Sequence, residues 1–392
     1  MSKNYDTSTD FPYLDKENVY LDSACQSLRP LPVIDAMRGY YTEYGSCGDR
    51  VKYRWGQKVD EQVDATRAAI LKYLKLRDKD YFVSFTLNTT YGINLILDQI
   101  RPDDIKKVMT SDIEHNSPFL STMTFARRHN LPREVMTRQR DGSINLDDYD
   151  FGGALVVVGS VSNVDGRRLM NLNDLVKKVH AGGGIIVIDA AQGMTLGSEL
   201  ITKTEADAIC FSAHKMYGPS LGAMVVRRDL LPRLDTTFIG GGMVDDVTSD
   251  SFVLSADSPP HAYTKFEAGL QPYAEIIGLS AAIDWLDRAK SASRIDEYAD
   301  RLYQILESTP GVNVINTAAT PIISWYHDKL DAHLLSEALS DAGIMTRSGY
   351  FCVHYYLDHV KHYPPLVRMS LGLHNRASDI DRVEEVLKNL GK

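Results

Sequence analysis

Residues 185–192 read IIVIDAAQ, and residues 208–219 read AICFSAHKMYGP. Both stretches begin with a continuous apolar run, which is typical of a strand buried on both faces, as in a parallel sheet covered by helices. The first run ends in Asp189, and the second ends in Ser212 and leads into a turn that carries Lys215. Because such sheets bind ligands at the carboxyl ends of their strands, these side chains are expected at one site.

The chain around these stretches alternates between helices and strands from about residue 60 to residue 230. A helix is predicted at 171–180, where apolar residues recur at helical spacing and the run stops at the glycines 182–184. Two further apolar runs, 81–85 and 154–158, indicate buried strands. The alternation predicts an α/β fold with a large, doubly wound, mainly parallel sheet.

The C-terminal part of the chain has a different pattern, with amphipathic helices around two short strand-like pieces, 312–315 and 321–326. The last helix is expected to be capped by Ser378, with Asp381 at the capping-box position. The apolar positions of the two helices are Ile295, Tyr298, Leu302 and Ile305, and Ile380, Val383, Leu387 and Leu390. We predict a large domain, 20–270, and a smaller α+β domain formed by 1–19 and 271–392.

The amino-acid composition and charge argue against some classes of protein. Of 392 residues, 44% are hydrophobic and 24% charged, and the net charge is −9. This balance is that of a globular protein and disfavours nucleic-acid binding, which needs a basic face. No signal peptide is recognised at the start, and the apolar stretches are too short for a membrane span, so a cytoplasmic protein is expected.

The four cysteines, Cys25, Cys47, Cys210 and Cys352, are widely scattered and form no Cys-x-x-Cys pair. Neither a disulfide framework nor a metal site is therefore predicted, and reduced thiols in a cytoplasm fit best.

Asp189 and Lys215 suggest one specific chemistry. An aspartate at a buried strand end can pair with a protonated pyridine nitrogen and keep a cofactor ring an electron sink, although it can also simply cap the next turn. A lysine on a turn can form an imine with an aldehyde if its surroundings lower its pKa, although most lysines are solvated. The spacing of 26 positions and the neighbouring Ser212, a possible phosphate donor, favour the cofactor interpretation.

Two further strand ends carry suitable groups. A helix is predicted to begin near Thr89, where the hydroxyls of Thr89 and Thr90 and free amide groups could bind a phosphate, or where a threonine could be an ordinary N-cap. His115, after another strand, could place a flat imidazole on the cofactor ring.

These motifs resemble the class V branch of the fold-type I pyridoxal-phosphate (PLP) enzymes, and most closely the cysteine desulfurase family of the SUF type. The resemblance covers nearly the whole chain. It is carried by 187–192 (VIDAAQ), 211–219 (FSAHKMYGP), 86–95 (TLNTTYGINL), 111–118 (SDIEHNSP), 20–24 (YLDSA), 162–166 (SNVDG), 266–269 (FEAG) and 368–371 (RMSL).

The resemblance implies a role for each matching residue. Lys215 would form the Schiff base with PLP, Asp189 would pair with the pyridinium nitrogen, and Gln192 would hold the ring hydroxyl. His115 would stack on the ring. The phosphate would be bound by Thr89, Thr90, Ser212 and His214. The substrate carboxylate would be bound by Asn163 and Arg368, with Arg368 using a bidentate fork that lysine could not reproduce.

The stretch 347–354 (RSGYFCVH) indicates which group is removed from the substrate amino acid. In desulfurases an R-x-G-x-x-C segment carries the cysteine that attacks the substrate sulfur, and Cys352 lies at the matching position. A nearby cationic Arg or His would help to ionise the thiol. Arg347, in the same segment, is expected among the substrate-binding residues. The alternative is that Cys352 is a small packed hydrophobic side chain.

The sequence departs from the family pattern at several positions. Leu270 stands where relatives carry a threonine that reaches the phosphate of the neighbouring subunit, so a homodimer is expected to make this contact through backbone or Gln271. Asp165 replaces an apolar residue, and Cys25 lies in a segment near the active site.

The leading hypothesis is conversion of L-cysteine into L-alanine and a persulfide on Cys352. The alternatives are a related class V enzyme, such as a selenocysteine lyase, a C–S β-lyase or an epimerase, and an idle homologue that acts as a sulfur-transfer partner. A sulfur-acceptor protein is a further possible partner. A nicotinamide enzyme is disfavoured because no G-x-G-x-x-G motif follows a strand.

Overall fold

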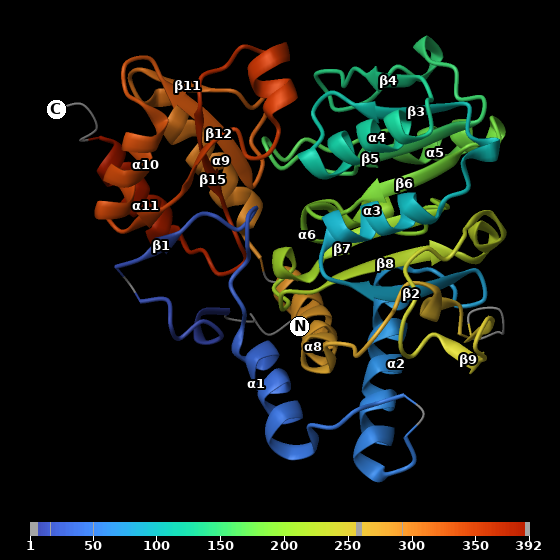
Figure 1. Ribbon diagram of the computed structural model, residues 1–392. Coiled ribbons are helices and arrows are strands. Elements are labelled where there is room, and N and C mark those ends of the chain that lie inside the picture. The colour runs from blue at the N-terminus through green and yellow to red at the C-terminus, as the bar shows by residue number, and fades with distance from the viewer. Residues whose placement is uncertain (1–6, 16, 50, 256–260, 292, 389–392) are drawn as a thin grey trace.

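The computed structural model describes residues 7–388, except 16, 50, 256–260 and 292. Its centre is a seven-stranded sheet in the order β2-β8-β7-β6-β5-β3-β4 (Figure 1). β8 is antiparallel to both of its neighbours, and the other strands run in one direction. The strands are β2 (Tyr81–Thr86), β3 (Lys107–Ser111), β4 (Arg133–Met136), β5 (Ala154–Gly159), β6 (Ile185–Asp189), β7 (Ala208–Ser212) and β8 (Gly222–Arg227). The predicted α/β class with a mainly parallel sheet is confirmed.

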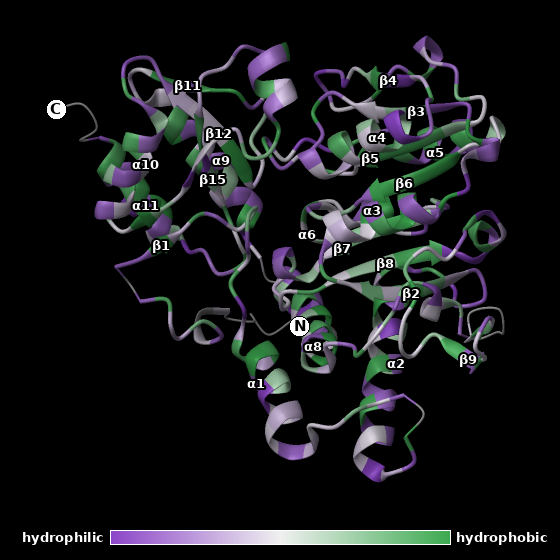
Figure 2. Cartoon of the chain, viewed as in Figure 1, coloured by the Kyte–Doolittle hydropathy of each residue, from purple (hydrophilic) through white to green (hydrophobic). Residues whose placement is uncertain are grey.

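Both faces of this sheet are buried. Along β6, Ile186 and Ile188 belong to one apolar cluster, whereas Ile185 and Val187 belong to the other, because successive strand residues point to opposite faces. β5 and β6 are coloured hydrophobic along most of their length in Figure 2. One face is covered by α2 (Arg54–Leu74), α5 (Leu172–Ala181), α6 (Gly193–Leu196), α7 (Ser198–Ile201) and α8 (Tyr273–Lys290), and the other by α3 (Thr89–Gln99) and α4 (Asn116–Arg128).

A second, smaller sheet lies beside the first (Figure 1). Its antiparallel strands are β11 (Val312–Val314), β12 (Ile322–His327), β15 (Leu366–Ser370) and β14 (Arg347–Gly349), in that order. It shares an apolar core with α9 (Ile295–Ser308), α10 (Ala332–Asp341) and α11 (Ala377–Leu387). The pair β1 (Val19–Tyr20) and β13 (Ile344–Met345) joins the N-terminal segment to this core, and a hairpin of β9 (Val244–Val247) and β10 (Phe252–Leu254) extends from the large sheet.

The division into 20–270 and 1–19 with 271–392 stays a prediction, and residues 1–6 and 389–392 lie outside the described residues. By its numbers α8 falls in the predicted small domain. Its buried residues Ile276, Leu279 and Trp285 nevertheless belong to the core of the large sheet. α8 also packs against α1 (Leu31–Gly39) and α2.

The start of the last helix differs from the expectation. α11 begins at Ala377, so Ser378 is its second residue rather than its cap. The carboxylate that reaches back is Asp379, which accepts a hydrogen bond of 3.0 Å from the backbone N–H of Arg376, and not Asp381. Asp381 instead forms an ion pair with Arg301 on α9, and its side chain is largely exposed. Among the residues that the structure describes, no helix is long and apolar enough to cross a bilayer.

A buried ion pair ties the segment after β10 to the large sheet. The guanidinium of Arg67 donates to both carboxylate oxygens of Glu267, at 2.9 and 2.7 Å. Glu267 also accepts a hydrogen bond of 2.7 Å from the backbone N–H of Phe85 at the end of β2. Only 4% of the Glu267 side chain and 12% of the Arg67 side chain is exposed.

Glu267→Ala should lower the free energy of unfolding by about 3–5 kcal/mol, because it leaves the Arg67 charge buried without its partner. Equilibrium urea unfolding measures this change. Glu297→Ala is the matched control, because the Arg294–Glu297 pair is about 60% exposed on both sides and should contribute under about 1 kcal/mol. Equal effects of the two variants would contradict the prediction.

Candidate active site

The predicted site residues come together in one cavity of about 360 Å³ at the carboxyl edge of the large sheet. The cavity is lined by Thr89, Thr90, His115, Asn163, Asp189, Gln192, Ser212, His214, Lys215, Arg347, Cys352 and Arg368. These residues come from the strand ends of the large sheet and from the C-terminal part of the chain, so distant parts of the sequence form one site.

Strand register places the first pair of residues. Asp189 ends β6 and is the register partner of Gly159 on β5 and of Cys210 on β7. β7 ends two residues later, and a short turn brings Lys215 to the same edge. Within the described part of the chain, no hydrogen-bond acceptor of the Lys215 Nζ atom is found. The amine is therefore free to react with a ligand in the cavity.

The surroundings of Lys215 and Asp189 shift the pKa values of both side chains. Burial lowers the pKa of Lys215, partly offset by the carboxylate of Asp189, and the guanidinium of Arg368 lowers it further. Burial also raises the pKa of Asp189, partly offset by the backbone N–H of Ala191 and by Lys215. A buried lysine with a lowered pKa is a nucleophile for an aldehyde, and a buried carboxylate favours a positive charge beside it.

Hydroxyl groups gather at the start of α3. Asn88 is the N-cap, and its side chain accepts a hydrogen bond from the N–H of Tyr91, so the two threonines after it need not cap the helix. The Thr89 Oγ1 and Ser212 Oγ atoms are 2.6 Å apart. The Thr90 hydroxyl is 2.6 Å from Ser117 Oγ. Hydroxyls beside a helix N-terminus form a suitable site for a phosphate group.

His115 is held as a neutral ring. It is the N-cap of α4, and its Nδ1 atom accepts a hydrogen bond of 3.0 Å from the backbone N–H of Ser117. Burial lowers the pKa of His115 to about 4, with smaller contributions from Lys215 and Arg368. A neutral, flat imidazole at the wall of the cavity can pack against an aromatic ring without adding a positive charge.

The opposite end of the cavity is cationic. Arg368 donates to Asp22 at 3.1 Å and to the backbone oxygen of Asn163 at 2.9 Å. Arg347 donates to the other oxygen of Asp22 at 2.9 Å and to Cys25 Sγ at 2.7 Å. One carboxylate thus serves two guanidinium groups, and the buried Arg368 Nε has no partner. The excess positive charge suits a substrate carboxylate.

Cys352 reaches the cavity on a backbone of unusual shape. Phe351 and Cys352 both have left-handed backbone angles, with φ of 49° and 59°. The Asn163 side chain donates 2.8 Å to the Phe351 oxygen, and the Asn116 N–H donates 2.7 Å to the Cys352 oxygen. The Cys352 side chain is exposed, so the expectation of a small packed hydrophobic side chain does not apply.

Some residues around the cavity were not found from the sequence. Asp22 lies inside a motif used for the resemblance, but its link to both arginines depends on the packing of two domains. Glu114 and Arg138 also line the cavity, and burial raises the pKa of Glu114 to about 7. The Gln192 amide donates to the oxygen of Ala24 at 2.6 Å. No spacing pattern in the sequence predicts such contacts.

The fold and cavity define a PLP-binding enzyme of fold-type I. The free amine of Lys215, the buried carboxylate of Asp189 and the hydroxyls around Thr89 match the aldehyde, the ring nitrogen and the phosphate of this cofactor. The chain matches the model of the aminotransferase class-V family over residues 19–383 and belongs to that family. Family members use PLP.

Similar proteins agree with this assignment. A probable cysteine desulfurase from Pyrococcus abyssi is 27% identical over 405 residues, covering 99% of this chain and 97% of the relative. One from Pseudomonas aeruginosa is 29% identical, covering 93% of this chain and 91% of the relative. The apo structure of a cysteine desulfurase from Thermococcus onnurineus superposes with a TM-score of 0.88 at 25% identity, covering 100% of this chain and 99% of that chain.

Lys215→Ala should abolish covalent attachment of PLP, because this amine is the free nucleophile of the cavity. Borohydride reduction followed by peptide mapping should find the modified residue at Lys215 in the unaltered protein. Lys290→Ala is the matched control. Burial lowers the pKa of Lys290 to about 8, but its Nζ already donates to Tyr73 Oη at 2.7 Å. Modification at Lys290 in the unaltered protein would overturn the assignment.

Proposed function

We propose that this protein is a cysteine desulfurase, which converts L-cysteine into L-alanine and leaves the sulfur as a persulfide on Cys352. The observation that carries the proposal is the presence of an exposed thiol, Cys352, in the same cavity as Lys215 and Arg368. The full-length similarity to proteins described as cysteine desulfurases supports it.

The residues of the cavity have separate tasks in this proposal. When bound, PLP supplies the electron sink that makes the bonds of the substrate α- and β-carbons labile. Asp189 would keep the ring nitrogen protonated, and Lys215 would hold the aldehyde and then move protons at the substrate α-carbon. His115 would pack on the ring. Arg368 holds the substrate carboxylate and thereby fixes which end of the amino acid faces the thiol.

The sulfur step uses the thiolate of Cys352. It attacks the substrate Sγ atom, a new S–S bond forms, the substrate C–S bond breaks, and its electron pair stays with the carbon that becomes the methyl group of alanine. The persulfide then has to reach an acceptor, which we propose to be a thiol of another protein. The SUF-type assignment belongs to this same proposal.

Cys352→Ala should keep PLP and bind L-cysteine, because Lys215 and Arg368 are unchanged, yet reduce alanine formation by at least about 100-fold. Alanine, pyruvate and sulfide should be measured separately. Mass spectrometry of the unaltered protein after treatment with L-cysteine should find one added sulfur on the Cys352 peptide.

Two further variants make this test specific. Cys47→Ala removes another exposed thiol, which lies outside the cavity, and should leave turnover unchanged. Cys25→Ala tests the rival thiol of the cavity and should have little effect. Normal turnover by Cys352→Ala would favour a lyase or epimerase instead, whereas a persulfide on Cys25 would make Cys25 the attacking thiol.

We further propose that the protein is a homodimer. Large apolar side chains are exposed around the β9–β10 hairpin and the segment that follows it. They are Phe238 (55% exposed), Val247 (62%), Phe252 (51%), Val253 (53%) and Leu270 (77%). Such a group of apolar side chains is typical of a protein interface. Leu270 lies within it, at the position where the family's cross-subunit phosphate contact is expected.

Phe252→Asp should shift the protein from dimer toward monomer and weaken PLP retention, because the charge would be buried at the interface. Analytical ultracentrifugation measures the first effect and absorbance after dialysis the second. Leu334→Asp changes an apolar residue on α10 that is 64% exposed, against 51% for Phe252, and is the control. A monomeric unaltered protein with full PLP occupancy would contradict the proposal.

A further inference from the structure

The residues that follow Cys352 are docked on the large domain. We call 350–360 the thiol segment. Its residues Val353 and Leu357 form an apolar cluster with Ile113 and Val164 of the large domain. In addition, the rings of Tyr355 and Phe119 stack at a centroid distance of 4.6 Å. The position of the thiol therefore depends on contacts between the two domains.

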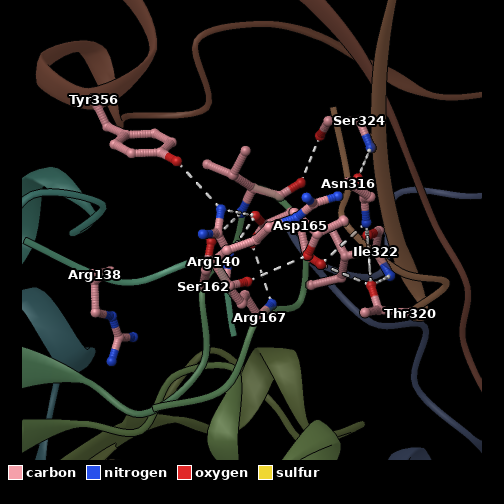
Figure 3. Close-up of polar contacts among 12 residues, drawn as sticks. Arg138, Arg140, Ser162, Asp165, Arg167, Asn316, Thr320, Ile322, Ser324 and Tyr356 are labelled. Carbon is pink, nitrogen blue, oxygen red and sulfur yellow. Dashed lines mark hydrogen bonds and ion pairs between the residues drawn. The ribbon is translucent and has the colours of Figure 1, made fainter. Parts of the chain in front are cut away.

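One of these contacts is polar and buried (Figure 3). Arg167 Nη2 donates to the hydroxyl of Tyr356 at 3.2 Å. The same guanidinium donates to one oxygen of Asp165 from Nε at 3.0 Å and from Nη2 at 2.6 Å. The exposed fractions of the Asp165 and Arg167 side chains are 3% and 13%. Asp165 thus orients a cation toward the thiol segment.

The loop that carries this ion pair is itself fixed from the other side. Thr320 Oγ1 donates to the Asp165 backbone oxygen at 2.8 Å, and Ser324 Oγ donates to the Val164 oxygen at 2.5 Å. Gly166 has a φ of 67°, and a Cβ atom there would lie 2.4 Å from Thr320 Oγ1. The loop therefore has little freedom to follow a movement of Arg167.

We propose that Asp165, Arg167 and Tyr356 form a latch that positions Cys352 for attack on the substrate sulfur. The inference rests on the proposed desulfurase function. Asp165 fixes the direction of Arg167, and Arg167 holds the Tyr356 hydroxyl, four residues after the thiol. These three are positioning residues, because none of them lines the cavity.

The backbone around the thiol explains why a latch is needed. Two successive left-handed residues without glycine, Phe351 and Cys352, form an unfavourable backbone conformation. The conformation persists only if the surrounding contacts hold it. Asn163 binds the backbone oxygen just before the thiol residue, and Asn116 binds the backbone oxygen of the thiol residue itself. Arg167 binds the segment after the thiol. Removal of the last contact should let the segment relax away from the substrate.

Tyr356→Phe tests the latch, because it removes one hydroxyl and keeps the buried ring. We expect kcat for alanine formation to fall about five- to tenfold, the net effect of one hydrogen bond, with KM for L-cysteine changed less than about twofold. Alkylation of Cys352 by iodoacetamide, followed by mass spectrometry, should become about fivefold faster. Asp165→Asn should act in the same direction and add little to Tyr356→Phe, because both act through Arg167.

The matched control is Tyr350→Phe. Tyr350 lies in the same segment, but its hydroxyl donates to the Tyr363 oxygen at 3.3 Å and does not reach the large domain. Equal kcat and alkylation rates for the Tyr350 and Tyr356 variants would overturn the latch. Faster alkylation with an unchanged kcat would overturn its role in positioning for catalysis. If Cys352→Ala still forms alanine, the proposed function fails, whereas the alkylation rate still tests the latch.

Discussion

The parallel register of β5, β6 and β7 is the constraint on which the site depends. It pairs Gly159 with Asp189 and Asp189 with Cys210, and it therefore ends the three strands at one edge of the sheet. Burial of both sheet faces makes a slip of this register costly, because a shift by one residue would exchange all side chains between the two faces. The cofactor end of the cavity is thus as rigid as the core beneath it.

The substrate end of the cavity depends on a different kind of contact. Arg368, Arg347 and Cys352 come from the C-terminal part of the chain, and Asp22, from the N-terminal part, links the two arginines. Polar contacts from Asn163 and Arg167 then connect the thiol segment with the large domain. A small shift between the domains would therefore move the thiol relative to the cofactor and leave the cofactor in place.

Much of the fold could be predicted because strong periodicity reports burial directly. The runs that became β5 and β6 are apolar throughout and are buried throughout. The start of α3 at Thr89 was also predicted, although its cap is Asn88. The start of α11 was misplaced because several polar residues in succession could each cap a helix. The sequence of α8 does not indicate which of the two cores the helix joins, because an apolar helix face could pack in either one.

The sequence by itself determined the class of fold and the family resemblance, and it predicted that Lys215 and Asp189 lie at one site, because these inferences depend on residue types in local patterns. Only the tertiary structure decided that Asp22 serves two arginines and that Asp165 directs Arg167 toward Tyr356. The last of these contacts joins residues 189 positions apart. The physical reason is that hydrogen bonds and ion pairs act over a few ångströms in space, so their partners are fixed by how the domains pack and by no local pattern.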